Sequence, residues 1–379
     1  MTSDSLSALA GQVLIVGFPA GTLPDTLRDL AGRGALGGFI LFRRNLTRAL
    51  APDHAGVTQL EQLPLAEIAA QHAALIAACP SELPPIIAID QEGGRVARLK
   101  APVLELPPMR VLGTLGDEAV TFSAGRILGT QLKALGVSLD FAPVLDVDSN
   151  PQNPVIGDRS FSADPEAVAR HGAAFARGLQ AAGVAACGKH FPGHGDTELD
   201  SHLALPRVGH PIDRLQAVEL LPFERAHQAC ASIMTAHVVF DALDPERPAT
   251  LSPSALSLLR ERFGYRGVIV SDDLEMRAIA DHHGVGDSAC GAIASGCDAL
   301  LVCSKPELTL EAHRALVARA ERDDAFRARL AEAAARCRQL RETYRATPLP
   351  PEQLAPLFTG GELYNEARAL EQCVRSAHG

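Results

Sequence analysis

The sequence lacks the features that mark membrane, secreted and nucleic-acid-binding proteins. No run of about 18 apolar residues occurs, so no segment is expected to span a membrane. The N-terminal MTSDSLSALAGQVLIVGF has an early acidic residue and no basic region, unlike a signal peptide. The 35 lysines and arginines are scattered through a chain of net charge −10, which argues against a nucleic-acid partner. We therefore expect a cytoplasmic protein that binds neither nucleic acid nor membrane.

Paired cysteines and nucleotide-binding fingerprints are missing too. The eight cysteines form no CxxC pair, and most have apolar neighbours. We expect them to be reduced and buried, not joined in disulfides or bound to zinc. No GxGxxG opens a helix after a predicted strand, and no GxxxxGK[ST] occurs, which argues against dinucleotide and NTP binding. No cofactor is expected.

The composition is that of a soluble globular protein of the size of an enzyme. The 379 residues are 47% hydrophobic and 21% charged, which suffices for a sizeable buried core. A chain of this length forms one large α/β domain or two ordinary ones.

Short apolar runs rich in Val, Ile and Leu recur along the chain. Their continuous hydrophobicity is typical of parallel strands that are buried on both faces. The predicted strands are residues 13–18, 37–42, 85–90, 138–147, 184–191, 232–240, 267–273 and 299–304.

Helical patterns separate these strands, over residues 65–79, 120–136, 167–183, 213–229, 252–264 and 311–323. This alternation predicts an α/β fold, a (β/α)8 barrel of the TIM type, with a doubly wound open sheet as the alternative. We expect residues 1–345 to form a single catalytic barrel. Residues 346–379, which include TPLPPEQLAP, are expected to form a Pro-rich linker and a short C-terminal helical tail.

Polar residues gather where the predicted strands end, which is where TIM-type barrels carry their chemistry. In strand order they are Asp90 and Arg98; Asp146, Asp148 and Arg159; Lys189 and His190; His237; and Asp272 and Asp273. Structural roles are the alternatives: helix caps for the aspartates, surface salt bridges for the arginines and a core position for His237. Two carboxylates at the top of one buried strand carry a desolvation cost that structure alone rarely requires, so a ligand site is favoured.

The segment KHFPGHGDTELDSH, residues 189–202, is the most polar of these strand ends. A metal site would use its histidines and Asp196, but Pro192, Gly193 and Gly195 prevent the helix that would align such ligands. A phosphate cradle would need a helix N-terminus after the glycines. Thr197 and Glu198 could start such a helix, but Lys189 lies before the loop and no Ser or Thr follows it. No metal is therefore expected.

Asp200 and His202 in the same segment favour proton transfer. In an extended loop, residues two apart point the same way, so the carboxylate can accept an imidazole N–H and stabilise the imidazolium. The alternative is a plain polar surface loop. Cleavage of an acetal through a covalent intermediate needs a general acid and a carboxylate nucleophile. This loop could supply the acid, and the seventh strand could supply the carboxylate.

Four segments together resemble one known family. KHFPGHGDTELDSH, AIDQEGGRVARL, GDRSF and GVIVSDDLEMRAI are similar to motifs of the family 3 glycoside hydrolases, in the branch of bacterial β-N-acetylglucosaminidases (β-hexosaminidases). The resemblance implies a TIM-type barrel and retaining removal of terminal non-reducing β-linked N-acetylglucosamine. Members of the family include cytoplasmic enzymes of peptidoglycan recycling, which implies a carbohydrate substrate such as a muropeptide (GlcNAc-anhydroMurNAc-peptide).

The resemblance also implies roles for individual residues. Asp272 would be the nucleophile, although spacing alone does not distinguish it from Asp273, and His202 would be the acid/base with Asp200 as its partner. The residues that would bind the sugar are Asp90, Arg98, Arg159, Lys189 and His190. The connection at residues 46–64 and the tail after 345 depart from the family pattern, and we expect a monomer or a weak homodimer.

Two other functions stay open from the sequence. A histidine acid/base would not repel phosphate, so the same site could serve a β-N-acetylglucosaminide or β-glucoside phosphorylase. A non-catalytic sugar-binding sensor on the same barrel is the alternative from another class, and it would need neither a nucleophile nor the Asp200–His202 pair.

Overall fold

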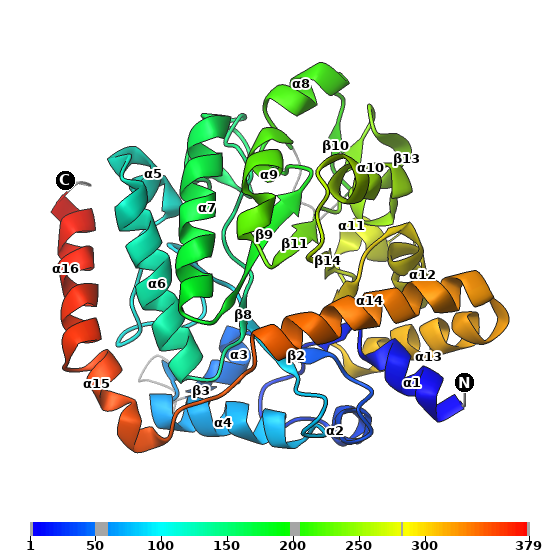
Figure 1. Ribbon diagram of the computed structural model, residues 1–379, viewed down its shortest axis with the longest axis horizontal. Helices are drawn as coiled ribbons and strands as arrows, with labels where there is room; N and C mark the ends of the chain where they lie inside the picture. The colour runs from blue at the N-terminus through cyan, green and yellow to red at the C-terminus, as the bar shows by residue number, and fades with distance from the viewer. Residues whose placement is uncertain (1–2, 50–59, 198–204, 282, 377–379) are drawn as a thin grey trace, which may run out of the picture.

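The structure is a computed structural model that describes residues 3–49, 60–197, 205–281 and 283–376 (Figure 1). Its centre is a closed barrel of parallel strands that follow one another in chain order. The barrel strands are β1 (Leu14–Val16), β2 (Gly38–Leu41), β5 (Ile86–Ile89), β8 (Leu139–Asp140), β9 (Ala185–Phe191), β11 (Ser232–Thr235), β14 (Val268–Asp273) and β15 (Ala299–Val302). The predicted TIM-type (β/α)8 barrel is confirmed.

The barrel strands are buried on both faces, as their continuous hydrophobicity requires. One apolar cluster takes residues from every barrel strand, for example Ala185 and Cys187 of β9, and fills the interior together with Phe141. The alternate residues of each strand, such as Ala186, belong to a larger cluster between the strands and the surrounding helices. The mouth of this filled barrel is therefore the place where a pocket can form.

The helices around the barrel are α1 (Ser3–Gly11), α2 (Asp25–Gly32), α3 (Arg43–Leu46), α4 (Leu65–Ala77), α5 (Met109–Leu115), α6 (Glu118–Ala134), α7 (Pro165–Ala181), α8 (Ile212–Ala217), α9 (Leu221–Ala226), α10 (Pro253–Ser257), α11 (Arg277–Ala280), α12 (Val285–Ser295), α13 (Pro306–Arg322) and α14 (Asp324–Thr343). Asp117 and Asp164 accept backbone N–H bonds at the starts of α6 and α7. These two helices pack very closely, since a Cβ on Gly178 would lie 2.3 Å from the carbonyl oxygen of Phe122.

Some predicted boundaries were wrong. The predicted helix 213–229 is split into α8 and α9, where Pro222 stands in the first turn of α9 and has no N–H to donate. The predicted strand 232–240 ends at Thr235, and β12 (Val239–Phe240) instead pairs with β10 (Arg207–Val208) and β13 (Asp244–Pro248). Ser252 caps a helix as predicted, but α10 has only five residues before a π-helical turn.

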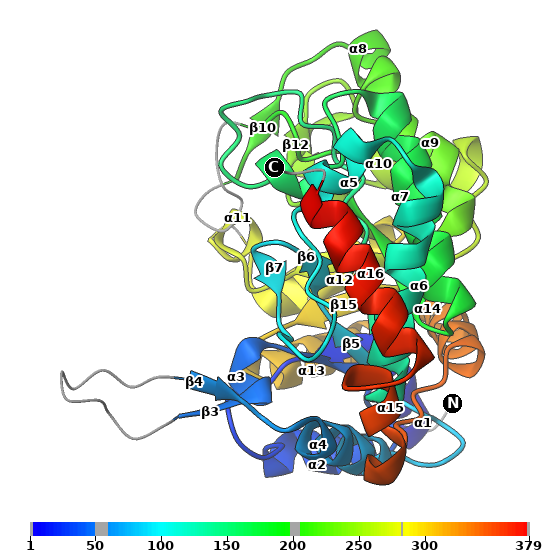
Figure 2. The same cartoon turned by 90° about the vertical axis from the view of Figure 1, so that its left-hand side faces the viewer.

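Two antiparallel hairpins extend from the C-terminal end of the barrel, on the left in Figure 2. One lies within the long connection after β2 and consists of β3 (Thr47–Ala49) and β4 (Leu60–Gln62). The other follows β5 directly and consists of β6 (Gln91–Gly93) and β7 (Val96–Ala97). The second hairpin carries part of the polar sequence that was predicted to form the site.

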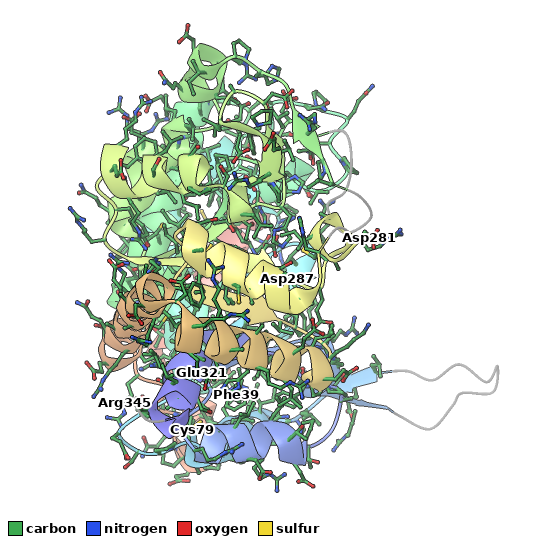
Figure 3. All side chains as sticks on the ribbon, turned by 90° about the vertical axis from the view of Figure 1, so that its right-hand side faces the viewer. Phe39, Cys79, Asp281, Asp287, Glu321 and Arg345 are labelled. Atoms are coloured by element: carbon green, nitrogen blue, oxygen red, sulfur yellow. The ribbon has the colours of Figure 1, made fainter. Side chains whose placement is uncertain are left out.

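The C-terminal tail runs along one side of the barrel. After α14, Arg345 donates to the carbonyl oxygen of Ser81 at 2.8 Å, in the connection after α4 that also contains Cys79 (Figure 3). The tail then forms α15 (Ala355–Phe358) and α16 (Glu362–Ser376), and α16 packs on α6 and α5 (Figures 1 and 2). The predicted C-terminal helix is thus confirmed. Within the four described ranges, no helix is both long and apolar enough to cross a bilayer.

Candidate active site

A pocket of about 250 Å³ opens at the C-terminal end of the barrel. The six described residues that were predicted as nucleophile or sugar ligands line it: Asp90, Arg98, Arg159, Lys189, His190 and Asp272. The strand-end residues Asp146, Asp148 and His237 do not line it. Glu92, His194 and Asp273 line it as well, beside apolar side chains that include Phe42 and Met276. Residues that lie far apart in the sequence therefore meet because each follows a barrel strand.

Alternating charges connect one side of this pocket. Asp90, directly after β5, accepts from the Lys189 ammonium at 3.1 Å and from the Arg98 guanidinium at 2.9 Å. Lys189 also contacts Glu92 at 2.6 Å, and Glu92 accepts two hydrogen bonds from Arg159, at 2.9 and 2.8 Å. Lys189 is thus fixed between two carboxylates, and Arg98 and Arg159 are each held by one. The remaining N–H groups of these cations can bind the hydroxyls of a ligand.

These groups stay charged although they are buried. Burial alone would raise the pKa of Glu92, but Arg159 and Lys189 outweigh it and hold this pKa well below its ordinary range. Burial would likewise lower the pKa of Lys189, yet Glu92 and Asp90 raise it. The pKa of Asp90 is lowered as well, because Lys189 and Arg98 overcome the effect of burial. The pocket therefore presents permanent charges at neutral pH.

A third carboxylate, Asp146, fixes the imidazole of His190. Asp146 Oδ2 lies 2.7 Å from His190 Nδ1, and its Oδ1 accepts the backbone N–H of His194 at 2.7 Å. Burial would raise the pKa of Asp146, but His190 lowers it, so the carboxylate is ionised and can only accept. Nδ1 of His190 therefore carries a proton, and Nε2 is the ring nitrogen that remains for a ligand.

The two aspartates at the end of β14 differ in their surroundings. Asp273 accepts the backbone N–H groups of Glu275 at 3.1 Å and of Cys303, the residue directly after β15, at 3.2 Å. Burial, with the charges of Glu275 and Asp272, raises the pKa of Asp273 to about 7. Asp272 accepts the N–H of Asp273 at 2.8 Å and lines the pocket beside the basic residues.

Residues 11–340 match the family model described as "Glycosyl hydrolase family 3 N terminal domain". The chain belongs to glycosyl hydrolase family 3. A β-hexosaminidase of Neisseria meningitidis serogroup C (strain 053442) is 42% identical over 286 residues, which cover 73% of this chain and 74% of that protein. The family 3 assignment makes the protein a glycoside hydrolase.

Solved structures of family 3 proteins have the same fold. A β-N-acetylglucosaminidase from Paenibacillus sp. str. FPU-7 is 38% identical with a TM-score of 0.86, over 98% of this chain and 68% of that one. NagZ from Neisseria gonorrhoeae, in complex with N-trifluoroacetyl-D-glucosamine, is 34% identical with a TM-score of 0.75, over 97% of both chains.

The predicted acid/base pair of this family 3 hydrolase, Asp200 and His202, lies outside the described residues. The residues that flank this segment are fixed. Asp196 on one side of the segment is hydrogen-bonded to Nε2 of His210 on the other side. The amide of Asn153 donates to the carbonyl oxygens of His194 (2.9 Å) and Thr197 (3.0 Å).

His194 is buried and contributes to this turn. Its Nδ1 lies 2.9 Å from the hydroxyl of Thr197. Burial and the neighbouring His190 lower the pKa of His194 to about 4, so its ring is neutral. Among the residues that the structure describes, no group of His, Cys, Asp and Glu is placed to hold a metal ion.

His237 occupies a core position, which was the alternative to a place in the ligand site. It is fully buried, with Nδ1 2.8 Å from the Thr250 hydroxyl and Nε2 2.9 Å from the carbonyl oxygen of Asp273. It therefore supports the end of β14. Sequence reasoning did not give roles to Glu92 and Asp146, although both belong to polar strand ends, because their partners come from other strands.

Proposed function

We propose that this family 3 hydrolase is a retaining exo-β-N-acetylglucosaminidase that removes terminal non-reducing β-linked N-acetylglucosamine. The observation that carries the proposal is the small pocket in which Asp272 faces fixed Asp, Lys, Arg and His side chains. Its volume of about 250 Å³ is below the roughly 300–1,000 Å³ of pockets for larger ligands, which suits one terminal sugar ring. Relatives named as β-hexosaminidase and β-N-acetylglucosaminidase support the choice of sugar.

The reaction runs in two steps. The Asp272 carboxylate attacks the anomeric carbon while protonated His202 gives its proton to the departing oxygen. Neutral His202 then takes a proton from water, whose oxygen displaces Asp272 and releases the sugar with its configuration retained. Asp200 accepts an imidazole N–H and stabilises the charged form of His202 in the first step.

The remaining predicted residues bind the sugar. The guanidinium and ammonium groups donate to hydroxyl and acetamido oxygens, and Asp90 accepts from hydroxyls. The residues with this role are Asp90, Arg98, Arg159, Lys189 and His190. The physiological substrate in this proposal is a GlcNAc-anhydroMurNAc-peptide, cleaved in the cytoplasm during peptidoglycan recycling.

Turnover of an aryl β-N-acetylglucosaminide tests this function. Wild type should release the aryl alcohol, with the β-anomer of the sugar detected first by NMR, and Asp272→Asn should lower kcat by at least about a thousandfold. Asp281→Asn, which alters an exposed ion pair with Arg277, is the matched control and should keep its activity.

Three results would contradict the proposal. They are wild-type-like turnover in Asp272→Asn, an α-anomer as the first product, and a sugar 1-phosphate formed only when phosphate is added. The last result would identify a phosphorylase. Sugar binding without any turnover would instead support a sensor.

A further inference from the structure

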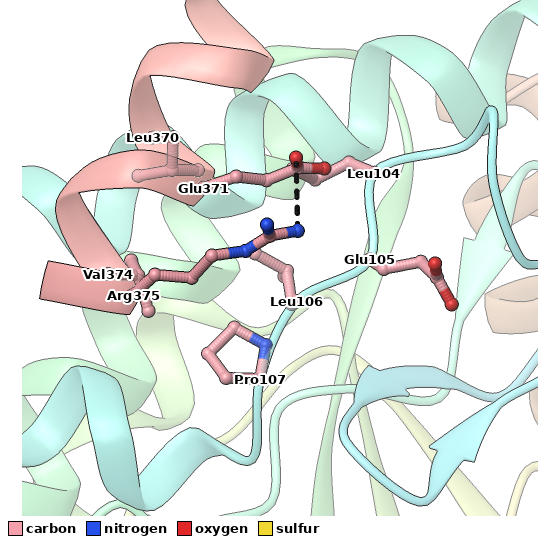
Figure 4. Close-up of a pocket in the computed structure, with 8 residues that line it drawn as sticks. All are labelled: Leu104, Glu105, Leu106, Pro107, Leu370, Glu371, Val374 and Arg375. Atoms are coloured by element: carbon pink, nitrogen blue, oxygen red, sulfur yellow. Dashed lines mark ion pairs between the residues drawn. The ribbon is translucent and has the colours of Figure 1, made fainter. Parts of the chain in front are cut away.

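The C-terminal helix α16 covers a segment of chain that leads to the sugar pocket. This helix lies outside residues 11–340, which match the family model. Its apolar residues Leu370 and Val374 face Leu104, Leu106 and Pro107 across a cavity of about 360 Å³ (Figure 4). We call residues 104–107 the strap.

One buried side chain joins the tail to the strap. Gln131 of α6 is 1% exposed. Its Oε1 accepts the backbone N–H of Leu104 at 2.7 Å, and its Nε2 donates to the carbonyl oxygen of Leu357 in α15 at 3.1 Å. Both ends of this amide are used, so the strap and the tail are held at a fixed separation.

The strap in turn supports the turn of the β6–β7 hairpin. The N–H of Gly94 donates to the carbonyl oxygen of Leu106 at 2.9 Å. A Cβ on Gly93 would lie 2.7 Å from the carbonyl oxygen of Pro107, and both glycines have positive φ angles of 115° and 53°. The turn therefore rests directly on the strap, with no room for a side chain between them.

The same hairpin carries two charges of the pocket. Glu92 lies in β6 and binds Lys189 and Arg159. Arg98 follows β7, and its backbone N–H donates to the side chain of Gln91 at 2.8 Å. A shift of the turn would therefore move both Glu92 and Arg98 relative to the barrel.

We propose that the C-terminal tail holds the strap, through the Gln131 bond to α15 and through Leu370 and Val374 of α16, and so positions the β6–β7 hairpin for sugar binding. Gln131, Leu370 and Val374 are positioning residues, since none of them lines the sugar pocket. Loss of their contacts should weaken substrate binding more than bond cleavage, because Asp272 lies on β14, on another part of the barrel wall. This inference rests on the proposed function only for the choice of substrate.

The test compares Gln131→Met and Leu370→Ala with wild type. Gln131→Met keeps the length of the side chain and removes both hydrogen bonds, and Leu370→Ala removes packing under α16. With an aryl β-N-acetylglucosaminide, KM should rise about threefold to tenfold while kcat stays within about twofold. Gln372→Ala, on the exposed face of the same helix, is the control and should leave both constants unchanged.

Hydrogen–deuterium exchange gives a second measurement that needs no substrate. Exchange in the peptide 91–98 should be faster in Gln131→Met and Leu370→Ala than in the control. The inference would be wrong if these variants lowered Tm but left both KM and the exchange of this peptide unchanged. The tail would then contribute to stability alone. Absence of turnover in wild type would contradict the proposed function instead, and the exchange data would still decide the inference.

Discussion

Replacing Glu92 by Gln removes one negative charge from between two buried cations and keeps the shape of the side chain. The Glu92 side chain is 2% exposed, and those of Lys189 and Arg159 are 3% and 12% exposed. Lys189 keeps Asp90 as a partner, but Arg159 loses the carboxylate that accepts two of its hydrogen bonds. An uncompensated buried charge lowers the free energy of unfolding by about 3–5 kcal/mol. Because Lys189 keeps Asp90 as a partner, we expect a loss near the lower value.

Urea unfolding at pH 7 measures this loss of stability. The matched control is Glu61→Gln, which changes an ion pair with Arg48 in which both side chains are about half exposed. The control should change the free energy of unfolding by less than about 1 kcal/mol. A loss below about 1 kcal/mol for Glu92→Gln, or one equal to that of the control, would refute the reasoning.

The pH dependence of this difference has a definite sign. Because the folded-state pKa of Glu92 is lowered, its stabilising effect is complete above the unfolded-state pKa of about 4.3 and is lost as the pH falls toward the folded-state value. The difference between wild type and Glu92→Gln should therefore be constant near neutral pH and shrink below about pH 4. A difference that grows on acidification would contradict the charge argument.

Three further substitutions test other contacts of the site. Asp146→Asn should lower kcat/KM about tenfold to a hundredfold, since it removes the carboxylate that orients His190; steady-state kinetics with unchanged kcat/KM would contradict this. Asp196→Asn weakens the hydrogen bond to His210 beside the segment that contains the proposed acid/base pair. It should therefore lower kcat more than it raises KM, and a change in KM alone would contradict this expectation. Asp273→Asn should gain stability relative to wild type as the pH rises from about 4 to 7, because the raised pKa of about 7 makes ionisation of Asp273 unfavourable in the folded state; pH-independent unfolding midpoints would contradict the assigned shift.

The barrel was predictable because its signal is local. Each strand is a continuous apolar run, and residues such as Asp117 and Asp164 mark helix starts directly in the sequence. The division at 213–229 was not predicted because the helical periodicity continues through Pro222. The end of β11 at Thr235 was not predicted because the residues that follow it form β12, whose partners β10 and β13 lie outside the predicted strand.

The convergence of six predicted residues at the mouth of the barrel was predictable, but the pairing of their side chains was not. Strand-end positions indicated that Asp90, Lys189 and Asp272 would converge, and they line one pocket. The partners Glu92 and Asp146 depend on how far side chains of different strands reach across the barrel mouth, and sequence spacing contains no such distances. The support of the β6–β7 hairpin by the C-terminal tail could not be predicted either, because it too depends on distances between segments that are far apart in the sequence.

The most direct test of the proposed mechanism is to identify the residue that becomes covalently glycosylated. A 5-fluoro glycosyl fluoride of N-acetylglucosamine should slow the second step and let the glycosyl-enzyme accumulate. Tandem mass spectrometry of the peptide 267–276 then distinguishes the neighbouring aspartates. The proposal predicts the sugar on Asp272; a label on Asp273 or on any other residue, or steady turnover with no labelled enzyme, would contradict it.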